Sequence, residues 1–360
     1  MSIRPADHGV FASAGGVAIV GLSGGTAFTV GTDNYMKFTA SGTLTVTGSG
    51  KVDYLIVAAG AGGGYNLTAS SGSGGGGGGG GLTWGTNYEL NAAVKSTFTI
   101  VIGAGGSGGN SSSSPKVGSS GSSCQITDFG LANGTSNFDF AGGTSYATTA
   151  DDTGSAGGGG GGEGGFRFGN SGADGATGVL ANTFLGSGDW GSGGGGGGGG
   201  GRDNVLGFNG GYGGNSVINT DSVAEGIDTI KSENSDGTIA THYVAGRNNG
   251  ATNSGTTGQQ GQPIVVGSVS SPSQVSSPSY GASLTSVNRG WLWSDSGRYG
   301  APGAGGQGDW YDANDGGGRG SNHGGPINAA VNQGGGGAGG HGSDGGTGGS
   351  GIIIFKILVG

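Results

Sequence analysis

Three uninterrupted runs of glycine constrain this chain more than any other feature of its sequence. The runs are Gly74–Gly81, Gly157–Gly162 and Gly193–Gly201. Glycine loses more backbone entropy on ordering than any other residue and offers no side chain to bury, so pure glycine stabilises neither an ordinary helix nor an ordinary strand. The runs are therefore either disordered or packed in an arrangement that needs bare backbone.

A bundle of left-handed, threefold extended helices is such an arrangement. Each helix rises about 3.1 Å per residue and makes no internal hydrogen bonds, so its N–H and C=O groups pair only with neighbouring helices. We expect an interior helix to be all glycine and a peripheral helix to have glycine at every third residue. Series with this spacing are Gly336, Gly339, Gly342, Gly345, Gly348 and Gly351; Gly169, Gly172, Gly175 and Gly178; Gly103, Gly106 and Gly109; Gly255, Gly258 and Gly261; and Gly300, Gly303 and Gly306.

The predicted fold is a mainly β and irregular chain, in which these polyglycine-II helices pack together between short flanking strands and long surface loops. Almost no α-helix is expected, because no segment sustains a 3.6-residue apolar period. The residues predicted for the core of the lattice are Gly74, Gly77, Gly80, Gly157, Gly160, Gly193, Gly196, Gly199, Gly342, Gly345 and Gly348.

Two regions are predicted. Residues 1–50 form an N-terminal β region that caps the bundle or docks to a partner protein, and residues 51–360 form the glycine-rich domain, with inserted loops at about 111–141, 163–192, 202–254 and 262–299. The strongest strands are Lys51–Ala59 and the run that begins at Ile352, and we expect the latter to pair with Val52–Val57. Leu82–Ile102 is consistent with a hairpin, as is Ser123–Phe129 with Ser136–Phe140.

Composition narrows the function classes. The 100 glycines and 7 prolines in 360 residues are typical of disorder, but a charged fraction of 10% is lower than a solvated disordered chain normally has.

The net charge of −9 with no Lys/Arg cluster predicts no nucleic-acid partner. The longest fully apolar run, Ile352–Phe355, is far shorter than the roughly 20 residues that cross a bilayer, so no membrane insertion is expected. Met1–Phe11 lacks an apolar signal core, so no export signal is expected either.

No motif predicts catalysis or a cofactor. Gly-x-Ser-x-Gly occurs at Ser23 and Ser107, but neither serine follows the strand-to-helix geometry that a nucleophile requires. The acidic stretch Asp309–Gly316 loses the alternating spacing of a calcium loop. Cys124 is the only cysteine, which excludes an internal disulfide and argues against a Cys/His metal site. We therefore expect a non-enzymatic protein without catalytic residues, metal or cofactor.

Aromatic residues in the insertions are the candidate binding residues. Aromatic rings stack on sugars and anchor protein contacts, and loops on a rigid scaffold often carry binding function. The alternative, equally open, is a hydrophobic cluster that pins an insertion to the bundle. The candidates are Trp190, Phe208, Tyr212, Trp291, Trp293, Tyr299, Trp310 and Tyr311.

Three stretches carry a family resemblance. Tyr35–Gly64, which contains FTASGTLTV and VDYLIVAAGAGGG, resembles the start of the glycine-rich domain of bacteriophage and marine-virus tail proteins. Phe98–Gly106 (FTIVIGAGG) and the ending Gly348–Lys356 (GGSGIIIFK) resemble later steps of the same domain. More distantly, the chain is similar to the tail-fibre-tip adhesins of T-even-like phages, whose receptor-binding domain is a polyglycine-II sandwich with variable loops.

The resemblance implies a virion protein in a phage tail or on the particle surface. The expected function is that of a tail fibre or tip adhesin that presents loops for host attachment. Its expected partners are other tail or capsid proteins and a bacterial surface glycan or outer-membrane protein, and the N-terminal β region then becomes a candidate virion attachment. A homotrimer is one assembly that fits such fibres. The alternative is a capsid or tail decoration protein, and a less favoured one is an ice-binding protein.

Overall fold

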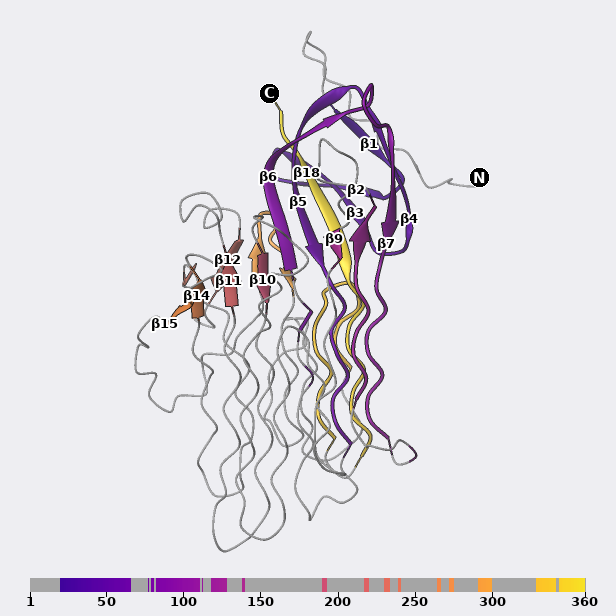
Figure 1. The fold of residues 1–360 in the computed structure, drawn as a ribbon, viewed down its shortest axis with the longest axis vertical. Helices are drawn as coiled ribbons and strands as arrows, with labels where there is room; N and C mark the ends of the chain where they lie inside the picture. Colours follow the sequence, from indigo (N-terminus) through magenta and orange to yellow (C-terminus); the bar gives the residue numbers. More distant parts are fainter. Residues whose placement is uncertain are drawn as a thin grey trace, which may run out of the picture.

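The computed structural model of the protein describes the sheets and several glycine-rich segments of the chain. The described residues are 20–65, 77, 79–80, 82–110, 112, 118–127, 138–139, 190–192, 217–219, 230–233, 239–240, 264–266, 272–274, 291–299, 328–340 and 343–359. All regular secondary structure in these residues is β-strand, arranged in three sheets (Figure 1). The expectation of a mainly β chain with almost no α-helix is confirmed for this part of the protein.

The largest sheet has nine strands in the order β15-β14-β11-β10-β6-β5-β18-β3-β2. Most neighbours are antiparallel, and β11 and β14 are parallel. The strands are β2 (Thr26–Val30), β3 (Asp33–Phe38), β5 (Ser49–Val57), β6 (Leu82–Asn91), β10 (Trp190–Ser192), β11 (Val217–Asn219), β14 (Ile264–Val266), β15 (Pro272–Gln274) and β18 (Ile352–Ile357).

Two smaller sheets accompany it. The five-stranded sheet has the order β1-β4-β7-β8-β9, with β1 (Gly21–Ser23), β4 (Gly42–Thr47), β7 (Thr97–Val101), β8 (Gln125–Ile126) and β9 (Phe138–Asp139). The four-stranded sheet has the order β13-β12-β16-β17, with β12 (Ile230–Glu233), β13 (Ile239–Ala240), β16 (Trp291–Trp293) and β17 (Arg298–Tyr299).

Strand β18, near the C-terminus, lies in the interior of the nine-stranded sheet. It pairs with β5 on one side, where Ile353 lies opposite Ile56, and with β3 on the other, where Ile353 lies opposite Phe38. A strand with neighbours on both edges and both faces covered is typically a continuous apolar run, which is what Ile352–Ile357 provides. The predicted pairing of this strand with Val52–Val57 is confirmed.

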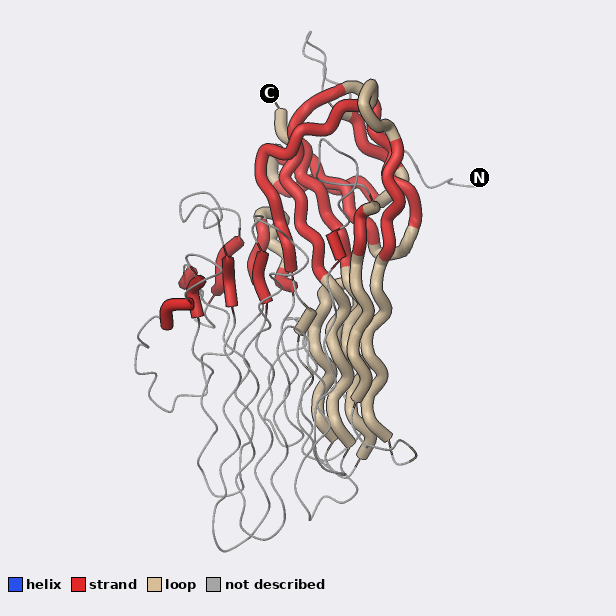
Figure 2. Tube along the Cα trace, viewed as in Figure 1, coloured by secondary structure: helices blue, strands red, loops and turns tan. Residues whose placement is uncertain are grey.

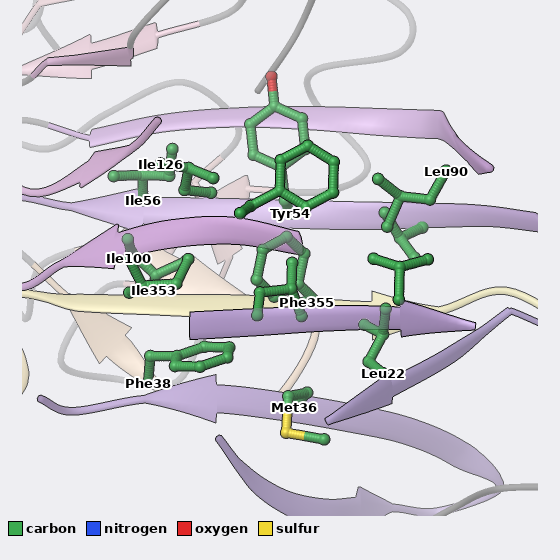
Figure 3. Packing of buried hydrophobic residues seen from close by; sticks show 14 of the residues in the cluster. Leu22, Met36, Phe38, Tyr54, Ile56, Leu90, Ile100, Ile126, Ile353 and Phe355 are labelled. Carbon is green, nitrogen blue, oxygen red and sulfur yellow. The ribbon is translucent and has the colours of Figure 1, made fainter. Parts of the chain in front are cut away.

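The main hydrophobic core fills the space between the nine-stranded and five-stranded sheets (Figure 3). Alternate residues of each strand supply it, because successive side chains of a strand point to opposite faces. Phe355 is fully buried there and meets Phe38 edge to face, with ring centroids 6.2 Å apart. The other buried members are Val20, Leu22, Met36, Leu44, Val46, Val52, Tyr54, Ile56, Leu90, Phe98, Ile100, Cys124, Ile126, Ile353 and Ile357.

A second cluster covers the opposite face of the nine-stranded sheet. It joins the alternate residues of β3, β5 and β18 to β16 and β17 of the four-stranded sheet. Its buried members are Tyr35, Leu55, Val57, Trp293, Tyr299, Ile352 and Ile354, with Phe28 and Val30 partly buried beside them. The central strands are therefore covered on both faces.

The N-terminal β region shares these cores. Three of its strands are β2 (Thr26–Val30), β3 (Asp33–Phe38) and β4 (Gly42–Thr47). Strand β3 pairs with β18, and β4 pairs with β7. The described residues before position 50 thus belong to the same two sheets as the later strands.

The two expected hairpins have different outcomes. Strands β8 and β9 pair in antiparallel fashion, which confirms the second hairpin. The first is wrong, because β6 pairs with β5 and β10 whereas β7 pairs with β4 and β8 in the other sheet. Phe98 and Ile100 of β7 face the main core from the five-stranded side, so the chain crosses from one layer to the other between β6 and β7.

Truncation of Phe355 tests the central position of β18. Phe355→Ala should lower the free energy of unfolding by about 3–5 kcal/mol, since it removes a large buried ring and leaves a cavity. Chemical denaturation followed by tryptophan fluorescence measures this. The matched control is Val359→Ala, just beyond β18, where the side chain is 68% exposed and a change within about 0.5 kcal/mol is expected. Equal effects of the two substitutions would contradict the assigned core.

Candidate functional site

Glycine-rich segments continue the strands at one end of the sandwich (Figure 2). The chain leaves β5 and β7 into such segments and enters β6, β8 and β18 from others. These segments have no regular secondary structure, yet they run side by side as extended backbone in Figure 2. The described segments are 58–65, 77 with 79–80, 103–110, 118–124, 334–340 and 343–351.

Segment 58–65 forms backbone hydrogen bonds to four other segments. A β-strand has at most two hydrogen-bonded neighbours, one on each edge, so this segment is not a strand of a sheet. It meets each neighbour at every third residue. Ala59 and Gly62 donate to Ser122 and Ser119; Gly60 and Gly63 donate to Gly349 and Gly346; Gly106 and Gly109 donate to Gly60 and Gly63; and Gly337 and Gly340 donate to Ala61 and Gly64, with N···O distances of 2.8–3.1 Å.

The neighbours bond to one another with the same period. Two glycine series that the sequence singled out are direct partners, because Gly345, Gly348 and Gly351 donate to Gly109, Gly106 and Gly103. Three further pairs of segments also bond at every third residue. They run from Ser119 and Ser122 to Ser107 and Ala104, from Gly346 and Gly349 to Ala338 and Gly335, and from Gly77 and Gly80 to Gly337 and Gly334.

Burial follows the same three-residue period. In segment 103–110, Gly103, Gly106 and Gly109 are buried, whereas Ala104 and Ser107 are exposed. In segment 118–124, the buried positions are 118, 121 and 124. Segments 58–65 and 334–340 are buried throughout. The first pair therefore lies at the periphery and the second pair in the interior.

Close backbone approach explains the glycines at the contacts. A methyl group on Gly60 would overlap the carbonyl group of Gly335, and one on Gly63 would overlap the carbonyl group of Ala338. These neighbours are backbone atoms, which cannot rotate away as a side chain can. The same overlap occurs at Gly106 against the carbonyl group of Ser119. Side chains at these positions would separate the segments and break their hydrogen bonds.

The interior segments are not all glycine, which departs from the sequence expectation. Ala59, Ala61 and Ala338 have no exposed surface. The physical reason is that successive residues of segment 58–65 meet different neighbours, and the separation from the neighbour differs among them. Some interior positions therefore accept a methyl group, whereas Gly60 and Gly63 do not.

The structure places four of the predicted lattice-core residues. Gly77, Gly80 and Gly345 are buried, and Gly348 is half-buried. All four belong to the hydrogen-bonded segments. The others lie outside the described residues: Gly74, Gly157, Gly160, Gly193, Gly196, Gly199 and Gly342.

Two of the candidate aromatic residues are packed against the sheet. Trp293 is 2% exposed and Tyr299 is 5% exposed, both within the second hydrophobic cluster. The ring of Trp293 meets Tyr35 of β3 edge to face, with centroids 5.9 Å apart. These two residues therefore belong to a hydrophobic cluster, as in the second of the two alternatives, and their ring faces are not accessible to a receptor. Trp190 and Trp291 lie in β10 and β16, whereas Phe208, Tyr212, Trp310 and Tyr311 lie outside the described residues.

Two tyrosine hydroxyls donate hydrogen bonds to the β16–β17 hairpin. The Tyr299 hydroxyl donates to Asp295 Oδ2 at 2.7 Å, and the Tyr35 hydroxyl donates to the Ser294 carbonyl at 2.9 Å. Burial raises the pKa of Tyr299, and the Asp295 carboxylate raises it further. Burial also raises the pKa of Tyr35. Both phenols are thus kept neutral and serve as donors. The Tyr35 hydroxyl links the hairpin to β3, and the Tyr299 hydroxyl bonds within the hairpin.

The sequence did not reveal that Tyr35 and Phe28 form the base of this aromatic cluster. Their rings stack with centroids 5.0 Å apart, and Tyr35 bonds to a residue 259 positions away. Alternation along Asp33–Phe38 does predict two faces, but it names no partner for either face. Such a distant contact leaves no local pattern.

Other site classes find no support in the described part of the chain. No group of three His, Cys, Asp or Glu side chains there is arranged to hold a metal ion. This part of the chain also contains no helix that is long and apolar enough to cross a bilayer. The acidic stretch Asp309–Gly316 lies outside the described residues.

Residues 39–205 match the model of a family described as a glycine-rich domain. The match begins just before β4 and includes segments 58–65, 103–110 and 118–124, which carry many of the described contacts. A comparison with curated proteins finds no significant match. The similarity is therefore to a glycine-rich domain and names no activity.

Substitution of Gly63 tests the close-packed segments. Gly63→Ala should lower the free energy of unfolding by about 1–3 kcal/mol, because the added methyl group must displace backbone. The control is Gly42→Ala, where the added methyl group meets no atom and a change within about 0.5 kcal/mol is expected. Thermal unfolding of both variants measures the difference. If Gly63→Ala is as stable as Gly42→Ala, the close approach is not present.

Alkaline titration tests the burial of Tyr299. A tyrosine whose folded pKa is raised contributes stability at pH values below its unfolded pKa of about 10, and this stability is lost as the pH rises toward the folded pKa. While folded, wild type and Tyr299→Phe should therefore show equal phenolate absorbance near pH 10. In denaturant, the wild type should titrate one tyrosine more. A difference of one tyrosine in the folded state would contradict the burial.

Proposed function

We propose that the glycine-rich segments form a bundle of polyglycine-II helices, which are left-handed, extended and threefold. The support is that segment 58–65 bonds to each of four neighbours at every third residue. A threefold backbone without internal hydrogen bonds directs its polar groups outward in three directions, which fits several neighbours around one segment. The period-three burial of segments 103–110 and 118–124 fits the same helix type.

Strand register supports an extension of this bundle to further glycine-rich sequence. Ser192 of β10 lies opposite Val217 of β11, and Val217 lies beside Ile264 of β14. These three strand ends adjoin, in the sequence, Gly193–Gly201, the glycine-rich stretch 207–214 and the period-three series at 255–261. Gly191 of β10 also lies opposite Leu82, which directly follows Gly74–Gly81. The glycine-rich sequence therefore adjoins the same end of successive strands.

We further propose that the protein is a non-enzymatic phage virion protein, a tail fibre or tip adhesin that presents loops for attachment to a host surface. The observation that carries this proposal is the arrangement of the segments, which all leave the sandwich at one end and bond laterally along their length. Such an array extends away from the sandwich, as the presentation of loops at a distance requires. The likeness of three stretches to phage tail proteins supports the same function.

The receptor surface then rests on residues other than the packed aromatics. Trp293 and Tyr299 pack against the sheet in the second hydrophobic cluster, so we assign them to the scaffold. Trp190, Phe208, Tyr212, Trp291, Trp310 and Tyr311 stay in the proposed receptor set. The partners proposed are a bacterial surface glycan or outer-membrane protein on one side and other virion proteins on the other.

An adsorption assay tests the adhesin function. Purified protein should bind intact cells of the host and block infection by the phage that encodes it. A double variant, Trp310→Ala with Tyr311→Ala, should weaken cell binding at least tenfold, as loss of central aromatic contacts typically does. The control is Val94→Ala, an exposed sandwich residue, which should bind as the wild type does. A wild-type protein that neither binds cells nor blocks infection would overturn the proposal.

Two alternatives give different results. A capsid or tail decoration protein would leave adsorption unchanged, and antibody labelling of the virion in electron micrographs would locate it on the head or along the tail. The exposed small side chains of Ala104 and Ser107 at three-residue spacing favour testing ice binding as well. A thermal-hysteresis measurement on the purified protein decides that alternative.

A further inference from the structure

Strand β2 forms one edge of the nine-stranded sheet. It pairs with β3 through all five of its residues, with Phe28 opposite Tyr35. In the described part of the chain, no strand pairs with its other edge. Thr26 and Thr29 are exposed, and Ala27, Phe28 and Val30 are half-buried. The outer edge of β2 therefore offers an extended backbone with apolar side chains beside it.

This edge lacks the features that normally prevent pairing with another chain. Natural sheets protect their edges with charged residues, proline, bulges or very short strands. The sequence TAFTV has no charge and no proline, and its register with β3 is continuous. By contrast, β1 at the edge of the five-stranded sheet is only 3 residues long. Among these two described edges, β2 is the one suited to accept a strand.

We propose that β2 pairs with β2 of a second copy of this chain, in antiparallel orientation about a twofold axis at Phe28. This register uses all five residues, because Phe28 lies opposite its own counterpart and Thr26 lies opposite Val30 of the second copy. A twofold interface of this kind is closed, since the same strand serves both partners. The two nine-stranded sheets become one continuous sheet across the dimer.

The aromatic residues on the face of the second hydrophobic cluster favour this register. Phe28 stacks on Tyr35 at 5.0 Å between ring centroids, and Lys37 Nζ lies 5.1 Å from the Phe28 centroid. Both neighbours come from β3, so the ring is already held in position in one copy. Antiparallel pairing at Phe28 extends this row to Tyr35, Phe28, Phe28 and Tyr35 across both copies. Aromatic pairs that lie directly opposite on neighbouring strands stabilise a sheet.

The charges of β3 are compatible with the antiparallel orientation but do not determine it. Lys37 lies opposite Thr26, and Asp33 lies opposite Val30. In the antiparallel dimer, Lys37 of one copy therefore shares a row with Asp33 of the second copy. The two charges are roughly 14 Å apart across both β2 strands, which exceeds the Debye length of about 8 Å, and Asp33 already pairs with Lys356 at 2.8 Å. The antiparallel orientation therefore rests on the twofold axis and on the Phe28 row.

Sedimentation equilibrium of the full-length protein tests the proposal. The wild type should have twice the monomer mass of 33.9 kDa at micromolar concentration. Thr29→Lys and Thr26→Lys each place a charge on the shared edge without removing a buried group, and each should weaken dimerisation at least tenfold. The matched control is Thr99→Lys, an exposed threonine of β7, whose two edges are both paired within the sheet; it should dimerise as the wild type does.

Contrary outcomes are equally clear. A monomeric wild type would mean that another segment of the chain covers β2, and a trimer would mean a different interface; either result overturns the proposal. Unchanged dimerisation of both lysine variants would also overturn it. If a variant fails to fold, hydrogen exchange on the wild type decides, because protection of the β2 amides should rise with protein concentration. Cell binding is measured separately, so its failure does not bear on this interface.

Discussion

The structure depends on hydrogen bonds between bare backbones that approach one another from several directions. A sheet satisfies backbone groups within one surface and leaves both faces free for side chains. Segment 58–65 instead has four bonded neighbours, with N···O distances of 2.8–3.1 Å. At positions such as Gly60 and Gly63 there is no room for a side chain, because an added methyl group would overlap a neighbouring carbonyl group. At these positions of the described segments, glycine is thus required by the packing geometry.

Where the strands of the two packed sheets continue into the glycine segments, the distance between their backbones becomes much shorter. Packed sheets lie about 10 Å apart because side chains fill the space between them, here Phe355 and Ile100 among others. At Gly351 and Gly103 the backbones of the two layers are 3.0 Å apart from N to O. Cys124 lies where the sandwich ends and the glycine segments begin. Its Sγ accepts a hydrogen bond from Gly103 N–H at 3.2 Å. The same sulfur leaves no room for a side chain on Gly351.

The sequence predicts the parts of this fold that a local pattern of residues specifies, such as an apolar strand or a regular glycine spacing. Lys51–Ala59 and the run from Ile352 are the strongest apolar strands, so their pairing could be predicted. The series at Gly103 and Gly345 could be found from spacing alone, although the spacing did not show that the two series bond to each other. The layer change between β6 and β7 could not be predicted. Alternating apolar and polar residues show that one face of a strand is buried, but they do not show which sheet packs against that face. The contact of Tyr35 with Trp293 had no signal either.

Hydrogen bonds to several neighbours also fix the position of each segment along the array. A segment that bonds to several neighbours at every third residue cannot slide along one of them without breaking its bonds to all the others. Each individual hydrogen bond contributes only about 0.5–1.5 kcal/mol net, but the bonds of one segment must break together. Because segments 58–65, 103–110 and 343–351 are also continuous with β5, β7 and β18, their register is fixed at the sandwich as well. The far ends of the segments are therefore held relative to the sheets, and this rigidity is what the proposed attachment function requires of a scaffold.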